Sequence, residues 1–338
     1  MVRLEQLSLF HVYTRGLGMS HEVETMVFAG ALPWHGLGTP ITDAHTFQEG
    51  FELAGLDWEV ETGPLYYFDE NNERVLFKKR RRVFRTSDNR TLGSVGPKWT
   101  PLQNREAFDI FEPLVESGDL KLHTAGSLRN GERIWCLLQM TAAPAEIVKG
   151  DEIAKFVLLS NGHDGQLAVR VGFTPIRVVC ANTEALARNH KASKLIRVRH
   201  SRFVKENCEA IRDVMNLANA EFETTAEQYR LLAARQINEH DLRKYIKLVL
   251  EIDTSKSEDE LSTRKKNLMD RVQWYFENGK GQDLKGVNGT WWGAYNAVTE
   301  YYNHEFGRNA NNRMDSVWFG QNQTVVTRAL DQALAMSA

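Results

Sequence analysis

The sequence predicts an α+β fold, with an antiparallel sheet and helices over the N-terminal two-thirds, followed by a mainly α-helical C-terminal part. Strand-like runs are joined by hairpin turns at 69–72 and 129–132. The helices expected before residue 200 stand between groups of strands, without the regular β–α alternation of a doubly wound sheet. Beyond residue 200, apolar residues recur at intervals of three and four, which is typical of amphipathic helices.

A chain of 338 residues is long enough for two structural units. We expect an N-terminal extension over residues 1–30 and a sheet-rich core over 31–200. A helical region is expected over 201–338, with the boundary where strand patterns give way to helical ones.

The sheet-rich core is expected to begin with a short helix over 46–55, because Phe47, Phe51 and Ala54 would share one face. Two strands follow within 58–86, on either side of an Asp-Glu-Asn-Asn turn.

Next, the sequence predicts a short strand and loop over 91–103 and a helix over 104–119. Asn104 is the expected cap of that helix, and Pro113 should disturb it near its end. A hairpin over 121–140 comes after it, since strand residues flank an Arg-Asn-Gly-Glu turn.

Two more strands and several helices complete the expected fold. The strands cover 154–162 and 167–180. In the helical region, Thr225 and Gln228 resemble a capping box that opens a new helix. The expected helices are 204–222, one from Thr225, 239–251, 258–278, 291–302 and 325–336.

The composition argues against several classes of function. No apolar run is long enough to cross a membrane, and three widely spaced cysteines do not form a disulfide framework. Neither a phosphate-binding loop nor a zinc-binding spacing occurs. We therefore expect a cytoplasmic protein without a cofactor or metal.

The net charge of −2 conceals strong segregation. Between Asp43 and Glu73 there are nine acidic residues and no basic one, whereas 74–90 and 188–205 each carry a net charge of +7. Dense basic clusters are typical of proteins that bind polyanions. In the first cluster, Lys and Arg would occupy both faces of a strand, so its middle cannot be buried. The alternative is a charged edge strand that prevents aggregation.

If the two clusters form one groove, it would hold a nucleic-acid backbone, because phosphate contacts require no special side-chain geometry. Two strand residues, Arg170 and Arg177, could line the same surface. The candidate nucleic-acid-binding residues are Lys78, Lys79, Arg80, Arg81, Arg82, Arg85, Arg170, Arg177, Arg188, Lys191, Lys194, Arg197, Arg199 and Arg202.

The stretch "FTPIRVVCANTEALARNH" raises the question of a cysteine nucleophile. Cys180 could be such a nucleophile with His163, His190 or His200 as its base, but no local signature places any of these histidines near the thiol. A buried cysteine where a strand leads into a helix capped by Asn182 explains the pattern better. Likewise, His163 and Asp164 are better explained by a turn with Asx hydrogen bonding than by a catalytic or metal pair. No catalytic residues are predicted.

Aromatic residues between 291 and 302 could stack on nucleobases. However, Trp291, Tyr295, Val298 and Tyr302 follow helical spacing, which indicates a core face.

Several stretches together resemble a family of phage and plasmid proteins, the domain of unknown function 932. They are "PWHGLG", "AGLDWEV", "GSLRNGERIW", "SNGHDGQLA", "TPIRVVCANT" and "GTWWGAYNAVTEY". The resemblance implies a cytoplasmic protein of a mobile element. Remoter similarity to phage single-strand annealing recombinases implies an oligomeric ring or filament that binds single-stranded DNA without nucleotide.

Three functional hypotheses follow. The first is a protein that binds and anneals single-stranded DNA and is not an enzyme. The second is an oligomeric phage protein that binds a host or defence protein, with the acidic stretch mimicking DNA or pairing with a basic strand of a neighbouring subunit. The third, a Cys/His hydrolase or a nuclease, lacks a clustered acid–base constellation.

Overall fold

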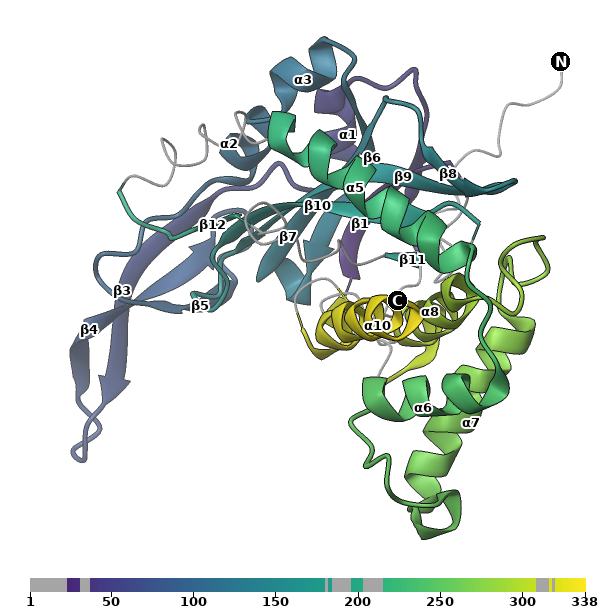
Figure 1. The fold of residues 1–338 in the computed structure, drawn as a ribbon. Coiled ribbons are helices and arrows are strands. Elements are labelled where there is room, and N and C mark those ends of the chain that lie inside the picture. Colours follow the sequence, from purple (N-terminus) through teal and green to yellow (C-terminus); the bar gives the residue numbers. More distant parts are fainter. Residues whose placement is uncertain are drawn as a thin grey trace, which may run out of the picture.

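The chain folds into a sheet-rich part, a projecting two-stranded arm and a helical part (Figure 1). The structure is a computed structural model that describes residues 23–30, 37–179, 182–183, 196–202, 215–307, 316–317 and 320–338. The mixed α+β class with a mostly antiparallel sheet is as the sequence predicts.

The larger sheet has the strand order β11-β10-β9-β7-β6-β1-β2, with β12 paired to β10 and β8 paired to β9. Its pairs are antiparallel except β1 with β2. The strands are β1 (Val23–Ala29), β2 (Thr39–Ile41), β6 (Leu120–Leu128), β7 (Arg133–Met140), β8 (Ala145–Val148), β9 (Asp151–Gly162), β10 (Val169–Arg177), β11 (Asn182–Thr183) and β12 (Ile196–Val198). Residues 23–29, which were expected to belong to an N-terminal extension, thus form β1 of this sheet.

Both faces of the larger sheet are apolar, and the period of two explains why. On β7, Ile134 and Cys136 belong to a core cluster on one face, while Trp135 and Leu137 belong to the cluster on the other. The first cluster also includes residues from the three N-terminal helices, α1 (Phe47–Leu53), α2 (Asn104–Asp109) and α3 (Glu112–Glu116). These helices therefore cover that face.

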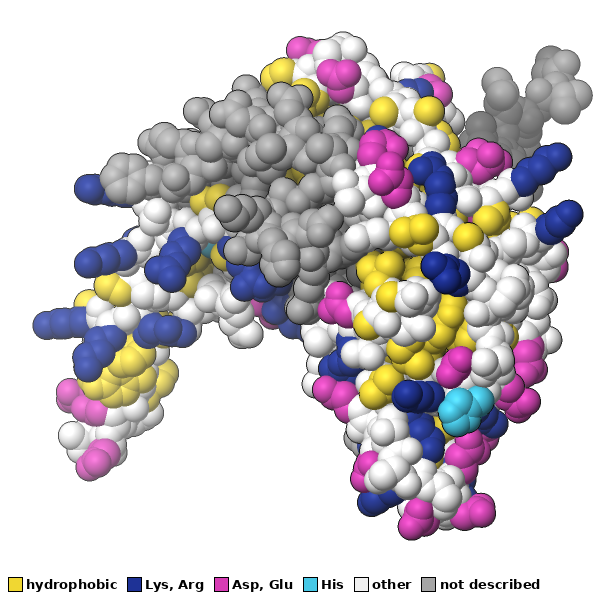
Figure 2. Space-filling model, viewed as in Figure 1, with side chains coloured by type: hydrophobic (Ala, Val, Ile, Leu, Met, Phe, Trp, Pro, Cys, Tyr) yellow, Lys and Arg dark blue, Asp and Glu magenta, His cyan; other side chains and the backbone are white. Residues whose placement is uncertain are grey.

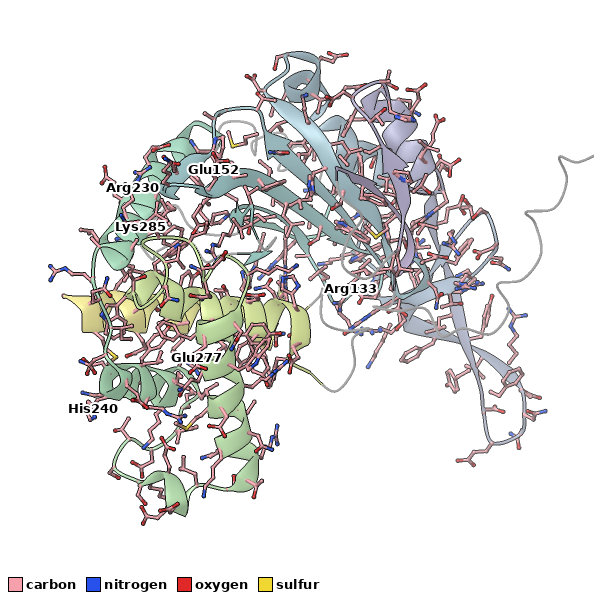
Figure 3. The ribbon with its side chains drawn as sticks, turned by 90° about the vertical axis from the view of Figure 1, so that its right-hand side faces the viewer. Arg133, Glu152, Arg230, His240, Glu277 and Lys285 are labelled. Carbon is pink, nitrogen blue, oxygen red and sulfur yellow. The ribbon has the colours of Figure 1, made fainter. Side chains whose placement is uncertain are left out.

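The smaller sheet has the order β3-β4-β5, formed by β3 (Val60–Phe68), β4 (Arg74–Arg85) and β5 (Thr91–Val95). We call β3, β4 and their turn the arm. It projects from the larger sheet, on the opposite side from the helical part in Figure 1 and away from it again in Figure 3.

The helical part contains α5 (Met215–Ala233), α6 (Glu239–Val249), α7 (Thr263–Asn278), α8 (Trp291–Glu300), a π-helical turn (Tyr301–Glu305) and α10 (Gln321–Ser337). Every residue of α8 is buried, which confirms that its aromatic face is core. The helical cluster also includes Ile147 of β8 and Ile153 of β9, so the helices pack against that edge of the sheet.

Three local expectations are wrong. The helix expected over 104–119 is split into α2 and α3, because Pro113 lies in the first turn of α3. Asn104 does not cap α2; its buried amide donates to the carbonyls of Leu56 and Trp58 instead. Thr225 opens no helix, since it lies buried inside the continuous helix α5.

Candidate nucleic-acid interface

The basic run of β4 lies where the two strands of the arm lose their regular pairing. Pro64 pairs with Arg81, but Tyr66 already pairs with Leu76. Between these pairs β4 contains four residues, 77–80, and β3 contains one, Leu65. Such a bulge leaves residues without a cross-strand partner and bends the strand.

Within this bulge, the side chains of Lys78, Lys79 and Arg80 are exposed, and Arg81 and Arg82 that follow are half-buried. This confirms that the middle of the strand is not buried. β4 is the central strand of its sheet only at residues 81–84, which pair with β5, whereas residues 78–80 lie in the two-stranded stretch beyond β5. The alternative of a charged edge strand therefore stays open for this stretch. Figure 2 shows Lys and Arg side chains gathered along the arm.

The arginines of this run donate hydrogen bonds to neutral acceptors of the smaller sheet. Arg80 donates to the hydroxyl of Ser94 at 3.1 Å, Arg81 to the carbonyl of Thr62 at 3.2 Å, and Arg82 to the hydroxyl of Thr91 at 2.8 Å. Across the described ranges, no carboxylate forms an ion pair with residues 78–82. Their positive charge is therefore not neutralised by an ion pair within that part of the chain.

Arg85 at the end of β4 has a different role, and the prediction that it lines the surface is wrong. Its side chain is buried, with hydrogen bonds to Asp88 at 2.7 Å and to Glu24 of β1 at 3.0 Å. The hydrogen bond with Asp88 raises the pKa of Arg85 and lowers the pKa of Asp88. Glu24 also accepts from Ser127 of β6, so Arg85 fastens the base of the arm to the larger sheet.

The second basic cluster is described in part. Arg197, Arg199 and Arg202 are exposed, whereas Arg188, Lys191 and Lys194 lie outside the described residues.

His200, within this cluster, joins it to the base of the arm. Its ring stacks on Trp99 with centroids 4.8 Å apart, and its carbonyl accepts from Thr100. Because Trp99 follows β5, and β5 pairs with β4, the two clusters lie on connected, neighbouring segments. Arg170 is half-buried on β10 and pairs in register with Arg197.

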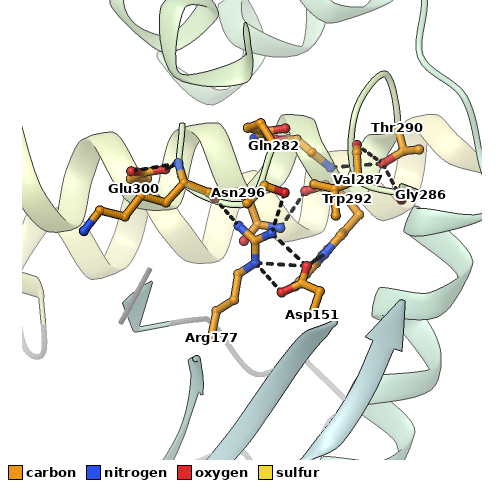
Figure 4. Close-up of polar contacts among 12 residues, drawn as sticks. Asp151, Arg177, Gln282, Gly286, Val287, Thr290, Trp292, Asn296 and Glu300 are labelled. Carbon is orange, nitrogen blue, oxygen red and sulfur yellow. Dashed lines mark hydrogen bonds and ion pairs between the residues drawn. The ribbon is translucent and has the colours of Figure 1, made fainter. Parts of the chain in front are cut away.

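Arg177 does not belong to this surface, contrary to the prediction. Its guanidinium is fully buried and forms a bidentate ion pair with Asp151, at 2.8 and 2.7 Å (Figure 4). It also donates to the carbonyls of Lys280 and Gly281 before α8. A buried charge of this kind requires such partners, which makes Arg177 a structural link between sheet and helices.

A group of exposed apolar residues at the far end of the arm escaped the sequence reasoning. This aromatic tip consists of Tyr66, Tyr67, Phe68, Leu76 and Phe77. The sequence contains a signal that could have revealed this group, because consecutive apolar residues on both sides of a turn cannot all point to one buried face.

The candidate catalytic groups that the structure describes lie in the core. Burial lowers the pKa of His163 to about 3. Burial also raises the pKa of the thiol of Cys136, a cysteine that was not among the catalytic candidates. Asp164 accepts from the backbone of Gln166 at 2.8 Å, which confirms the Asx turn.

Cys180 and His190 lie outside the described residues, and Asn182 belongs to β11, so it does not begin a helix. Over the described ranges no three His, Cys, Asp or Glu residues are grouped as metal ligands. No helix in the same ranges is both long and apolar enough to span a bilayer.

Comparison with known proteins yields a family without an assigned activity. The sequence profile of the family described as a domain of unknown function (DUF932) matches residues 91–318, which is more than half of the chain. No curated protein and no solved structure matches.

Proposed function

We propose that this chain, which belongs to the DUF932 family, binds single-stranded DNA and promotes its annealing without a nucleotide or a metal. The observation that carries the proposal is the exposed positive charge of Lys78, Lys79 and Arg80 on a projecting arm, which no carboxylate of the described residues neutralises. Phosphate contacts supply most of the affinity of sequence-independent binding, and such a run provides them.

The neighbouring segment 197–202 supports the same proposal. It adds exposed arginines beside the base of the arm, so a strand that follows the arm would meet a second basic region. We extend the proposal to a cytoplasmic, phage- or plasmid-encoded protein that acts as a homo-oligomer, in a ring or filament. In such an assembly the arms of several subunits would hold one strand, and pairing would be left to the bases.

Fluorescence anisotropy of labelled oligothymidine tests this function, alongside a duplex of equal length. We expect tight binding to the single strand at roughly 50 mM salt that weakens steeply toward roughly 300 mM. The triple variant Lys78→Glu, Lys79→Glu, Arg80→Glu should lose at least about tenfold in affinity and reduce the salt dependence by about three phosphate contacts.

A matched control reverses three exposed charges on the helical part, Arg264→Glu, Lys265→Glu and Lys285→Glu. This control changes the net charge by the same amount, so an equal loss of affinity for oligothymidine would mean that only the overall charge of the protein determines binding. Absence of binding at low salt would contradict the proposal and favour a protein partner. If binding is found, an annealing assay with complementary oligonucleotides follows.

A further inference from the structure

The aromatic tip places apolar side chains on both faces of a two-stranded ribbon. Tyr66 pairs with Leu76 and Tyr67 pairs with Val75, so successive residues of β3 point to opposite faces. The ring of Tyr67 meets that of Phe77 edge to face, with centroids 6.1 Å apart. Phe68 is 68% exposed and Tyr67 is 49% exposed. Two strands alone bury neither face, so this surface is suited to a partner.

The chemistry of the tip favours nucleobases. Its exposed side chains are mostly aromatic, and the guanidinium of Arg74 lies over the ring of Tyr66 at 3.7 Å, which adds a planar cation. Aromatic rings and arginine are the groups on which unpaired bases stack, irrespective of sequence.

The order of rings and charges along the arm indicates the path that a bound strand would follow. Phe77 is followed directly by Lys78, Lys79 and Arg80, and strand residues are spaced by about 3.3 Å, so these three charges follow the ring of Phe77 within roughly 10 Å along β4. At the other end, the exposed carboxylates of Glu70 and Glu73 and the half-buried carboxylate of Asp69 surround the turn and repel phosphate. A DNA strand with its bases stacked on the rings would therefore place its phosphates toward the base of the arm, away from the acidic turn.

We propose that the rings of Tyr67 and Phe77 on one face of the ribbon, and the ring of Phe68 on the other face, form a stacking platform on each side for unpaired bases, while the adjoining basic run holds the phosphates. The inference rests on the proposed function and adds a base contact to it. It explains how an arm rich in positive charge would prefer a single strand, because the bases of a duplex are already stacked on each other.

An abasic oligonucleotide separates the two kinds of contact, because it has the same phosphates as oligothymidine but no bases. We expect the natural protein to bind oligothymidine roughly 10- to 100-fold more tightly than the abasic strand. The double variant Tyr67→Leu, Phe68→Leu should remove this difference without changing binding to the abasic strand. Leucine keeps an apolar tip, so this loss would report the rings themselves.

The outcomes distinguish this inference from the proposed function. Equal, salt-dependent affinity of the natural protein for both oligonucleotides would overturn the stacking platform and leave phosphate binding intact. Failure to bind either one would overturn both proposals. A preference for oligothymidine that survives Tyr67→Leu, Phe68→Leu would overturn the platform, and altered sedimentation of Tyr67→Ala, Phe68→Ala would then identify the tip as a subunit contact. Circular dichroism of the variants, with unchanged spectra expected, verifies that each is folded.

Discussion

Asp151 and Arg177 form an ion pair in which both side chains have no exposed surface, with Oδ2 and Nη2 2.7 Å apart. Asp151 begins β9 and Arg177 ends β10, so the pair closes one end of two neighbouring strands. The indole of Trp292 in α8 donates to the same carboxylate at 2.8 Å. One buried charge pair therefore connects the larger sheet to the most buried helix.

Removing one member of this pair should strongly destabilise the protein. Asp151→Ala leaves the guanidinium of Arg177 buried without its counterion, for which we expect a loss of about 3–5 kcal/mol in the free energy of unfolding. Urea denaturation followed by circular dichroism measures this loss. As a control, Asp43→Ala breaks the exposed pair with Lys121 and should cost less than about 1 kcal/mol. Similar losses in both variants would contradict the assigned structural role.

Long-range partners explain which parts of the interface the sequence could predict. The sequence pattern of 58–86 was sufficient to predict two strands joined by a turn, and the charge on both faces of 74–85 predicted the exposure of the middle of the second strand. The burial of Arg85 and Arg177 was not predictable, because their carboxylate partners Glu24 and Asp151 lie 61 and 26 residues away. A local pattern contains no information about such pairing.

The bulge in β4 and the role of Asn104 could not be predicted from the sequence, for related reasons. The register of the arm changes near Pro64, which has no backbone N–H to donate, and this depends on the partner strand as much as on β4. Asn104 resembles a cap by its type and position, yet its amide binds carbonyls 46 and 48 residues away. Tertiary contacts thus decide between two acceptable uses of the same side chain.

Arg80 and Arg85, five positions apart on one strand, should separate binding from stability. Arg80→Ala removes an exposed charge and one hydrogen bond to Ser94, so we expect weaker binding of oligothymidine and a change in unfolding free energy below about 0.5 kcal/mol. Arg85→Ala should cost about 2–4 kcal/mol, because Glu24 loses its partner in a largely buried site. Anisotropy and urea denaturation on both variants provide the comparison. The reverse pattern would mean that the assignment of the two residues is wrong.

Substitutions at two glycines close together in the sequence, Gly93 and Gly96, test the contact between β5 and the loop after β9. A Cβ at Gly93 would lie 2.5 Å from the backbone oxygen of Asp164, whereas a Cβ at Gly96 would meet open space. Backbone cannot move aside as a flexible side chain does, so Gly93→Ala should lower the unfolding free energy by roughly 1–3 kcal/mol. Gly96→Ala should leave thermal stability almost unchanged. Comparable melting temperatures for the two variants would show that the loop does not press against β5.

Two buried histidines should make stability depend on pH. Burial lowers the pKa of His163 to about 3 and the pKa of His200 to about 4, below the value of about 6.5 expected in the unfolded chain. The unfolded state then binds more protons between these values, so the free energy of unfolding falls as the pH decreases from about 6.5 toward 4. The slope is at most about 1.4 kcal/mol per pH unit for each histidine.

The variant His163→Gln tests the larger of these two contributions. His163 Nε2 lies 2.9 Å from the Asn104 oxygen, and the Asn104 amide already donates to two carbonyls, so the ring is the donor in this bond. A glutamine amide can donate in the same way but does not titrate. Thermal unfolding between pH 4 and 7 should therefore show a shallower decrease for His163→Gln than for the natural protein, whereas exposed His240→Gln should follow the natural profile. An unchanged slope in His163→Gln would show that this histidine is protonated as easily in the folded chain as in the unfolded one.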